Sequence, residues 1–244
     1  SKLQFDHRNT QLHDLDDGLL KDYDDSLKNF QKEHNLTIFH LMGQHVNYKQ
    51  RYRTKQARFW ASSYEDKRPE LTNAQRKMLS HYDNATLYND SIVAQIVKRF
   101  QKQDAIVIYV PDHGEECYEE NRGFICRNHS AEIDWPLAHY EFEIPFWIYC
   151  SPKYIRNHRD IYRQIRKAKD KRFMTDALPH LLLYLAGIET PTYKEEYNIL
   201  SPKYDEMRPR ILKNSADYDK LRDAHLEKIK KEESKKVKKK ERRN

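Results

Sequence analysis

The sequence predicts an α/β fold in which a largely parallel sheet is flanked by helices. Apolar runs of strand length alternate along the chain with longer segments whose apolar residues recur at helical spacing. The run at 104–110 is apolar without alternation, as expected for a strand that helices cover on both faces. The chain has only five glycines, which argues against a β protein dominated by loops.

The first part of the chain contains two predicted helices and one predicted strand. Leucines and aromatic residues recur at helical spacing over 17–35, and the apolar run at 36–43 ends in glycine, which indicates a buried strand. The segment 47–72 is polar, aromatic and irregular, so we expect it to run over the surface. Residues 73–103 keep a 3.6-residue period and predict a long helix.

The second part continues the alternation of strands and helices. Strands are predicted at 104–110 and 140–151, a short basic helix or loop at 160–170, and a helix at 173–188 that ends at Gly187. In sheets built this way, ligands collect outside the carboxyl ends of the strands. The loops that follow the strands are therefore where we look for chemistry.

The C-terminus carries most of the net charge. The whole chain has a formal charge of +7, and residues 227–244 hold ten Lys and Arg against four Glu. We therefore divide the chain into a folded portion, 1–216, and a basic tail that is helical or disordered, 217–244. The folded portion is close to neutral, so a basic nucleic-acid-binding fold is not predicted.

Neither a membrane-spanning segment nor a targeting signal is predicted from the sequence. No apolar run approaches the roughly 20 residues that cross a bilayer. The polar and acidic opening lacks the apolar core of a signal peptide. Such an opening is compatible with a piece excised from a longer protein.

Histidines and acidic residues gather where the predicted strands end. Carboxylate and imidazole together suit Zn²⁺ or Mn²⁺, and a catalytic zinc site keeps one position open for substrate. Gly114 would allow the backbone to approach closely there. A structural Asp-His loop and a packed His40 are the alternatives, and Glu115 and Glu116 are expected to be solvated. The candidate clusters are His40 with His45, Asp112 with His113, and His129 with His139.

The three cysteines leave two alternatives open. Cys117 and Cys126 bracket one loop, while Cys150 lies in a predicted strand, and none of them forms a C-x-x-C spacing. A disulfide between Cys117 and Cys126 would require an oxidising compartment. Two thiols are equally compatible with the sequence.

Five segments taken together resemble one known family. In chain order they read FHLMGQHVNYKQRY, YDNATLYNDSIVAQIV, IYVPDHGEE, EIPFWIYCS and TDALPHLLLYLAGI. They resemble the sulfatase-like phosphoethanolamine transferases of the alkaline phosphatase superfamily, and the resemblance covers most of residues 36–210. Where the family pattern reads S-D-H-G-E, this chain has Pro111 in place of the serine.

The resemblance implies an alkaline phosphatase/sulfatase-like fold and a metal-dependent transferase. Members of this family have a catalytic domain on the periplasmic face of the bacterial inner membrane. They move phosphoethanolamine from phosphatidylethanolamine to lipid A or the core of lipopolysaccharide, through a phosphoenzyme on a zinc-bound threonine. The implied partners are thus a phospholipid donor and a lipopolysaccharide acceptor, with no nucleic acid. We expect a monomer that is attached to the membrane through missing N-terminal segments.

The resemblance also implies roles for particular residues. Asp112 and His113 match the family's zinc ligands, with Mn²⁺ or another divalent metal as the less favoured cofactor. His45 matches the second histidine of the family's H-x-x-G-x-H motif and would contact the phosphate or a second metal ion. His40, the first histidine of that motif, belongs to the same region. His129 matches the histidine in the loop after D-H-G-E, and His139 is its alternative because that loop is long here.

The family's nucleophile has no counterpart in this sequence. The threonine and an acidic zinc ligand lie well upstream of the H-x-x-G-x-H motif in the family, and nothing before His40 resembles either. Thr10 lies in a polar leader and Thr37 in the predicted buried strand. We therefore expect the C-terminal portion of a catalytic domain, incomplete at its N-terminus and inactive alone. The alternatives are a sulfatase or another phosphodiester or sulfate-ester hydrolase of the superfamily, and a degenerate binding domain whose basic tail holds an acidic partner or anionic lipid.

Overall fold

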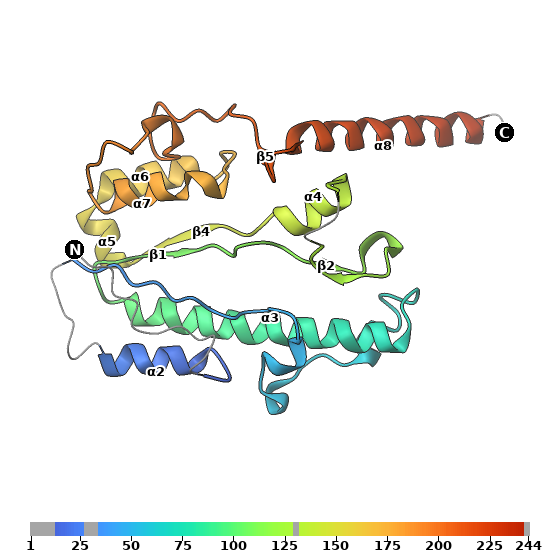
Figure 1. Ribbon diagram of the computed structural model, residues 1–244, viewed down its shortest axis with the longest axis horizontal. Helices are drawn as coiled ribbons and strands as arrows, with labels where there is room; N and C mark the ends of the chain where they lie inside the picture. Colours follow the sequence, from blue (N-terminus) through green and yellow to red (C-terminus); the bar gives the residue numbers. More distant parts are fainter. Residues whose placement is uncertain (1–12, 27–33, 129–131, 242–244) are drawn as a thin grey trace. The chain divides into compact units, whose positions relative to one another are not determined.

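The computed structural model describes residues 13–26, 34–128 and 132–241 (Figure 1). The chain forms two compact units. Unit 1 comprises residues 1–102 and 117–126, and unit 2 comprises residues 103–116 and 127–244. Each unit has its own apolar clusters, so each can be understood from its own sequence.

Two helices form the framework of unit 1. Helix α2 spans Asp17–Ser26, and helix α3 spans Asn73–Phe100, close to the helix predicted at 73–103. Thr72 and Gln75 start α3 with a reciprocal capping box. The Thr72 side chain accepts from the Gln75 amide, and the Gln75 side chain accepts from the Thr72 amide.

The segment predicted to run over the surface is irregular, as expected, but α3 holds it firmly. It contains three 3₁₀ turns. The buried side chain of Asn84 on α3 accepts hydrogen bonds from the amides of Arg58 (2.7 Å) and Phe59 (3.1 Å) and donates to the Phe59 carbonyl (2.8 Å). Asp83 accepts a hydrogen bond from the Tyr64 hydroxyl. The turns are Tyr48–Gln50, Thr54–Gln56 and Ala61–Tyr64.

The buried strand predicted at 36–43 is wrong. In the described part of the chain this segment is irregular and pairs with no strand, and Leu36 and Ile38 are 74% and 69% exposed. An apolar run has the propensity for a strand, but a strand requires a neighbour that completes its backbone hydrogen bonds. Thr37 is therefore not inside a buried strand either.

Unit 2 is built on a pair of strands. Strand β1 (Ile106–Tyr109) and strand β4 (Trp147–Cys150) are antiparallel, with Ile106 opposite Cys150 and Tyr109 opposite Trp147. Both strands were predicted, although the second is shorter because Trp135–Phe142 forms helix α4. The α/β class is as predicted, while this described pair is antiparallel rather than parallel. An alternation of elements predicts the fold class, whereas the direction of pairing depends on which strands become neighbours.

Helices cover the remainder of unit 2. Helix α6 (Arg159–Ala168) confirms the helical option at 160–170, and α7 (Leu178–Leu185) ends two residues before Gly187, where φ is +64°. The amides of Gly187 and Ile188 return to the carbonyls of Tyr184 and Leu183, which satisfies the end of the helix. The helices are α5 (Pro152–Asn157), α6 (Arg159–Ala168), α7 (Leu178–Leu185) and α8 (Tyr218–Glu241).

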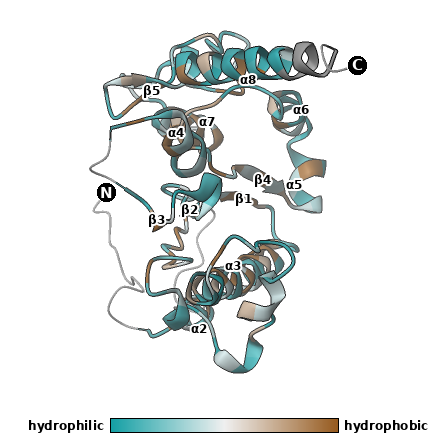
Figure 2. Ribbon diagram, turned by 90° about the vertical axis from the view of Figure 1, so that its right-hand side faces the viewer, coloured by the Kyte–Doolittle hydropathy of each residue, from teal (hydrophilic) through white to brown (hydrophobic). Residues whose placement is uncertain are grey.

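Hydropathy separates the core elements of unit 2 from its C-terminal helix. Figure 2 shows β1 and α7 as largely hydrophobic and α8 as largely hydrophilic. Leu181 of α7 is fully buried in a cluster with Ala168, Ile199 and Leu200. No helix within the described ranges is both long and apolar enough to span a membrane.

Two short hairpins complete the described strands. Strand β2 (Glu116–Cys117) pairs with β3 (Ile125–Cys126), and β5 (Ile211–Leu212) pairs with β6 (Ala216–Asp217). Cys117 and Cys126 are thiols in the structure and lie on the two strands of the first hairpin. The pairing of these strands keeps the two cysteines near each other, so the sequence alternatives for them remain.

Candidate functional site

The predicted metal ligands lie directly beyond the end of β1. The Asp112 side chain is 86% exposed, and the His113 side chain is 26% exposed. His113 Nε2 lies 3.6 Å from Asp112 Oδ1, so a ring nitrogen and a carboxylate oxygen meet at one point. The exposure of Asp112 leaves this point accessible to an ion or a substrate from solvent.

The hydrogen bond on the other ring nitrogen determines the tautomer of His113. Nδ1 lies 2.6 Å from the carbonyl oxygen of Gly114. A carbonyl can only accept, so Nδ1 carries the proton and donates it, and the neutral ring then has its lone pair on Nε2. Metal-binding histidines commonly donate their second nitrogen to a carbonyl in this way. The geometry of the pair therefore fits a zinc ligand set.

Helix α4 holds the loop that carries the pair. The amide of Gly114 donates to the carbonyl of Glu141 (2.8 Å). A Cβ at position 114 would lie 2.3 Å from the carbonyl oxygen of Tyr140 and 3.2 Å from that of Glu143. The close backbone approach expected of Gly114 is thus present, and the partner is α4 itself.

Glu141 also holds the chain on the other side of the loop. Its buried carboxylate accepts a hydrogen bond from the Asn128 amide (2.6 Å), and Arg127 Nη1 lies 3.9 Å from Asp112 Oδ2. His129, the next residue, lies outside the described residues. Sequence reasoning missed Glu141. The available signal was an acidic residue within the apolar stretch LAHYEFEIPF, which requires a buried partner.

His139, the alternative to His129, is engaged by its own helix. Its Nδ1 lies 2.9 Å from Glu143 Oε1, and its ring stacks on Trp135 with centroids 5.4 Å apart and an interplanar angle of 11°. These contacts favour a packing role for His139. Its place in the metal or substrate site stays a prediction.

The acidic residues after the Asp-His pair are less exposed than the sequence suggested. Glu116 lies in β2 and is fully buried, so the expectation that it is solvated is wrong. Glu115 is half-buried. The burial of Glu116 depends on the folded chain around it, which two residues of strand could not predict from sequence.

His40 and His45 belong to unit 1, and both are exposed. Their loop turns at Gly43, where φ is +53°, and the His45 amide returns to the Met42 carbonyl (3.0 Å). The Gln44 side chain bonds to Thr86 and Asn89 of α3, each at 3.3 Å. Within the ranges that the structure describes, no group of three or more His, Cys, Asp or Glu residues is placed to hold a metal ion.

A buried carboxylate anchors the loop of His45. Asp16 is 5% exposed, and its two oxygens accept hydrogen bonds from the amides of Met42 (3.0 Å) and Gly43 (2.9 Å). Charge-assisted bonds to two successive amides fix the backbone two residues before His45. The sequence showed only an acidic residue ahead of a helix, a position from which this long-range role could not be predicted.

Replacement of Asp16 by alanine is expected to lower the free energy of unfolding of unit 1 by about 2–4 kcal/mol, because two partly buried amides lose their charged acceptor. Hydrogen exchange at Met42 and Gly43 should accelerate, and urea denaturation gives the stability. Asp25→Ala removes an exposed aspartate of α2 and should change stability by less than about 0.5 kcal/mol. Unchanged exchange at the two amides in Asp16→Ala would refute the anchoring role.

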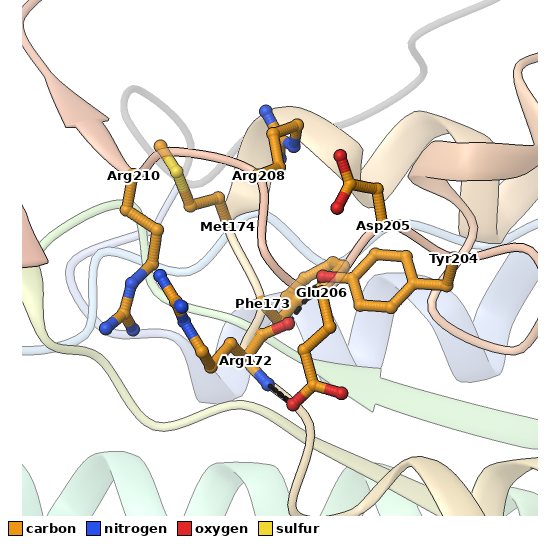
Figure 3. A pocket seen from close by; sticks show the side chains of 8 residues that line it. All are labelled: Arg172, Phe173, Met174, Tyr204, Asp205, Glu206, Arg208 and Arg210. Carbon is orange, nitrogen blue, oxygen red and sulfur yellow. Dashed lines mark hydrogen bonds between the residues drawn. The ribbon is translucent and has the colours of Figure 1, made fainter.

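Unit 2 has a concave region whose lining side chains make contacts that stabilise the fold. Figure 3 shows it lined by residues from Arg172–Met174 and from the segment Tyr204–Arg210. It has room for about one water molecule. Arg208 makes two hydrogen bonds to Asp176 (2.6 and 2.8 Å), and Tyr204 donates to the Arg172 carbonyl (2.5 Å). It contains none of the histidines or acidic residues of the predicted site.

The fold and the Asp-His pair together define a class. An accessible aspartate and a histidine that meet at a strand exit of an α/β domain supply two donor groups of the kinds that bind a catalytic metal ion. Residues 3–188 match the sulfatase family model, and the chain belongs to the sulfatase family. The resemblance drawn from the sequence motifs is thereby confirmed.

The similar curated proteins are phosphoethanolamine transferases. Phosphoethanolamine transferase EptC of Escherichia coli strain RS218 is 31% identical over 202 residues, which are 82% of this chain and 33% of that protein. The Kdo(2)-lipid A phosphoethanolamine 7''-transferase of E. coli K12 is 32% identical over 162 residues, 65% of this chain and 27% of that protein. The chain thus spans about a third or less of the length of these relatives.

Solved structures confirm the alkaline phosphatase/sulfatase-like α/β fold. The crystal structure of the C-terminal periplasmic domain of EptC from E. coli, in complex with zinc, superposes with a TM-score of 0.70 at 28% identity. The match covers 88% of this chain and 60% of that domain. The corresponding domain from Campylobacter jejuni, with a TM-score of 0.60 at 23% identity, shows the same fold.

Proposed function

We propose that this chain is the C-terminal portion of a catalytic domain that transfers phosphoethanolamine from phosphatidylethanolamine to lipid A or the core of lipopolysaccharide. The observation that carries the proposal is the Asp112–His113 pair, whose Nε2 and Oδ1 converge at the exit of β1. The relatives named as phosphoethanolamine transferases support it. The proposal places the domain on the periplasmic face of the bacterial inner membrane.

Zinc is the proposed cofactor, with Asp112 and His113 as two of its ligands. The hydrogen bond from His113 Nδ1 to the Gly114 carbonyl orients the ring for this role, and the zinc complex of the similar E. coli domain supports the choice of metal. Bound there, the ion would supply charge that polarises the phosphoryl oxygens. The bonds from Gly114 and Asn128 to Glu141 hold both sides of the loop in place.

The histidines are proposed to contact the transferred phosphate. His45 would donate a hydrogen bond to a phosphoryl oxygen from a loop that Asp16 anchors. His40 and His129 are proposed as further contacts to the substrate or a second metal ion. Imidazole donors of this kind stabilise the negative charge that the phosphoryl oxygens carry during transfer.

The nucleophile is proposed to be a threonine on a part of the domain outside this sequence. The matched segments begin after the region where the family carries that threonine, and the chain covers 60% of the similar solved domain. The chain then contributes ligands and substrate contacts but cannot form the phosphoenzyme. The chain is therefore expected to be inactive by itself. We further propose that the protein acts as a monomer.

The proposal is tested with phosphatidylethanolamine labelled in its headgroup, lipid A as acceptor, and zinc. We expect no transfer by the chain alone. A longer polypeptide that adds the upstream part of the domain should transfer the label, and Asp112→Ala should abolish that activity. Transfer by the chain alone would refute the external nucleophile. Hydrolysis of a sulfate ester without transfer would favour a sulfatase instead.

A further inference from the structure

The first turn of α8 is held by a network of side-chain ion pairs centred on Asp219. Asp219 accepts hydrogen bonds from Arg172 and from Arg210 (2.6 Å), and Arg222 Nη1 lies 3.3 Å away. The hydrogen bond from Arg210 holds the pKa of the Asp219 carboxyl below its usual range. A depressed pKa means that the network is intact at neutral pH and is lost only as the pH falls through that lower value.

The second turn of α8 packs on α4 through aromatic rings. Trp135 of α4 stacks on His139 and also on His225 of α8, where the centroids are 5.1 Å apart at 23°. The centroid of the Tyr218 ring lies 5.7 Å from that of the Trp135 ring. The guanidinium of Arg210 lies over the Tyr218 ring, 4.3 Å from its centroid. The start of α8, from Tyr218 to His225, is thus fixed to the body of unit 2.

Beyond His225 the helix loses contact with the body of unit 2. Every residue from Leu226 to Lys235 is exposed, and Figure 1 shows α8 continuing past α4. An ion pair joins Lys231 to Glu227 at 3.6 Å, one turn apart within the helix itself. Packing against the described core does not explain such a helix, because a helix exposed all round depends on pairs within itself or on a partner.

Lysines lie on more than one side of this exposed part. Lys228, Lys231 and Lys235 follow each other at spacings of three and four, so they share a face of the helix. At 3.6 residues per turn, Lys230 lies on the opposite side of the helix, near Leu226, so the helix is basic on both sides. The sequence continues with four more lysines up to residue 240.

We propose that residues 226–241 of α8, the basic arm, bind the surface of an anionic phospholipid bilayer. Residues 226–241 contain eight lysines against four glutamates, and an exposed helix with this excess of positive charge fits a broad anionic surface, to which each lysine adds attraction. Residues 226–244 contain no aromatic side chain that could stack on bases and no arginine before residue 242, which disfavours nucleic acid. Two exposed apolar side chains are too few for insertion, so the attraction is electrostatic.

The test is sedimentation of the full chain with vesicles. We expect binding to vesicles of phosphatidylcholine with phosphatidylglycerol, no binding to phosphatidylcholine alone, and release at high salt. Replacement of Lys228, Lys231 and Lys235 by glutamine should weaken binding on the order of 100-fold. The matched control removes the same charge from exposed lysines elsewhere in unit 2, Lys153, Lys167 and Lys169, and should leave most of the binding.

Three outcomes would overturn the proposal. They are no sedimentation with phosphatidylglycerol vesicles, an equal loss in the two triple variants, and tighter binding to an oligonucleotide that the arm variant abolishes. Circular dichroism of both variants verifies that the body of the chain remains folded. The readout is lipid binding, so it is independent of the proposed transferase activity.

Discussion

The chain is expected to bind zinc through Asp112 and His113, and replacement of either residue by alanine should weaken that binding at least about tenfold. The reason is that His113 Nε2 and Asp112 Oδ1 meet within 3.6 Å, so both side chains can contact one ion and neither substitutes for the other. Titration with zinc in competition with a chromophoric chelator measures the affinity. The Asp112 side chain is exposed and the His113 side chain is partly exposed, so the variants are expected to fold.

A second Asp-His pair in unit 2 provides the control. His158 Nε2 lies 3.3 Å from Asp104 Oδ1, with side chains 41% and 31% exposed. This pair also brings a carboxylate and an imidazole together, but it does not lie in the D-H-G loop. The double variant Asp104→Asn with His158→Gln should therefore leave zinc binding unchanged. Equal losses in both pairs would mean that any adjacent aspartate and histidine bind the ion, and no loss at Asp112 or His113 would remove the basis for the metal site.

Gly114→Ala is expected to lower the free energy of unfolding of unit 2 by about 3 kcal/mol. The new Cβ would lie 2.3 Å from the Tyr140 carbonyl oxygen, a backbone atom of α4 that cannot move aside like a flexible side chain. Relief requires the loop to separate from α4, which breaks the bond from Gly114 to Glu141 and moves the carbonyl that orients His113. Zinc affinity should therefore fall together with stability.

Gly187→Ala is the matched control for this effect. Gly187 also lies in unit 2 and has φ of +64°, but nothing lies within 4 Å of an added Cβ. Gly187→Ala should lower the free energy of unfolding by about 1 kcal/mol, because alanine is strained in the left-handed backbone, and it should leave zinc binding unchanged. Urea denaturation of the two variants separates the steric cost from the conformational cost. If Gly114→Ala were no worse than Gly187→Ala, α4 would not be what holds the loop.

Local elements were the most predictable part of this protein. The long helix ends near its predicted bounds because the capping box at Thr72 and the 3.6-residue period are both written in adjacent residues. Helix α7 ends at Leu185, close to the stop signal at Gly187, although the helix is shorter than the predicted 173–188. By contrast, the run at 36–43 has the composition of a strand but is exposed and irregular, because a strand needs a partner that composition does not name.

In the candidate site, too, the local features were predicted from the sequence and the long-range contacts were missed. The D-H-G motif and its place after a strand were read from the sequence, and so was the need for glycine at position 114. Asp16 and Glu141 were missed, because each acts on residues distant in the chain: Asp16 on Met42 and Gly43, and Glu141 on Gly114 and Asn128. The burial of Glu116 was missed as well, since the sequence around it reads as an acidic loop.

What the sequence by itself determined is the family, the α/β class, the helices with their own start and stop signals, and the identity of the proposed metal ligands. These depend on residue types and spacings that are close in the chain. What only the tertiary structure decided is the antiparallel pairing of β1 with β4, the tautomer of His113, and the anchors Asp16 and Glu141. The strand pairing and the two anchors depend on hydrogen bonds between segments far apart in sequence, and the His113 tautomer depends on the local loop conformation that places the Gly114 carbonyl beside the ring.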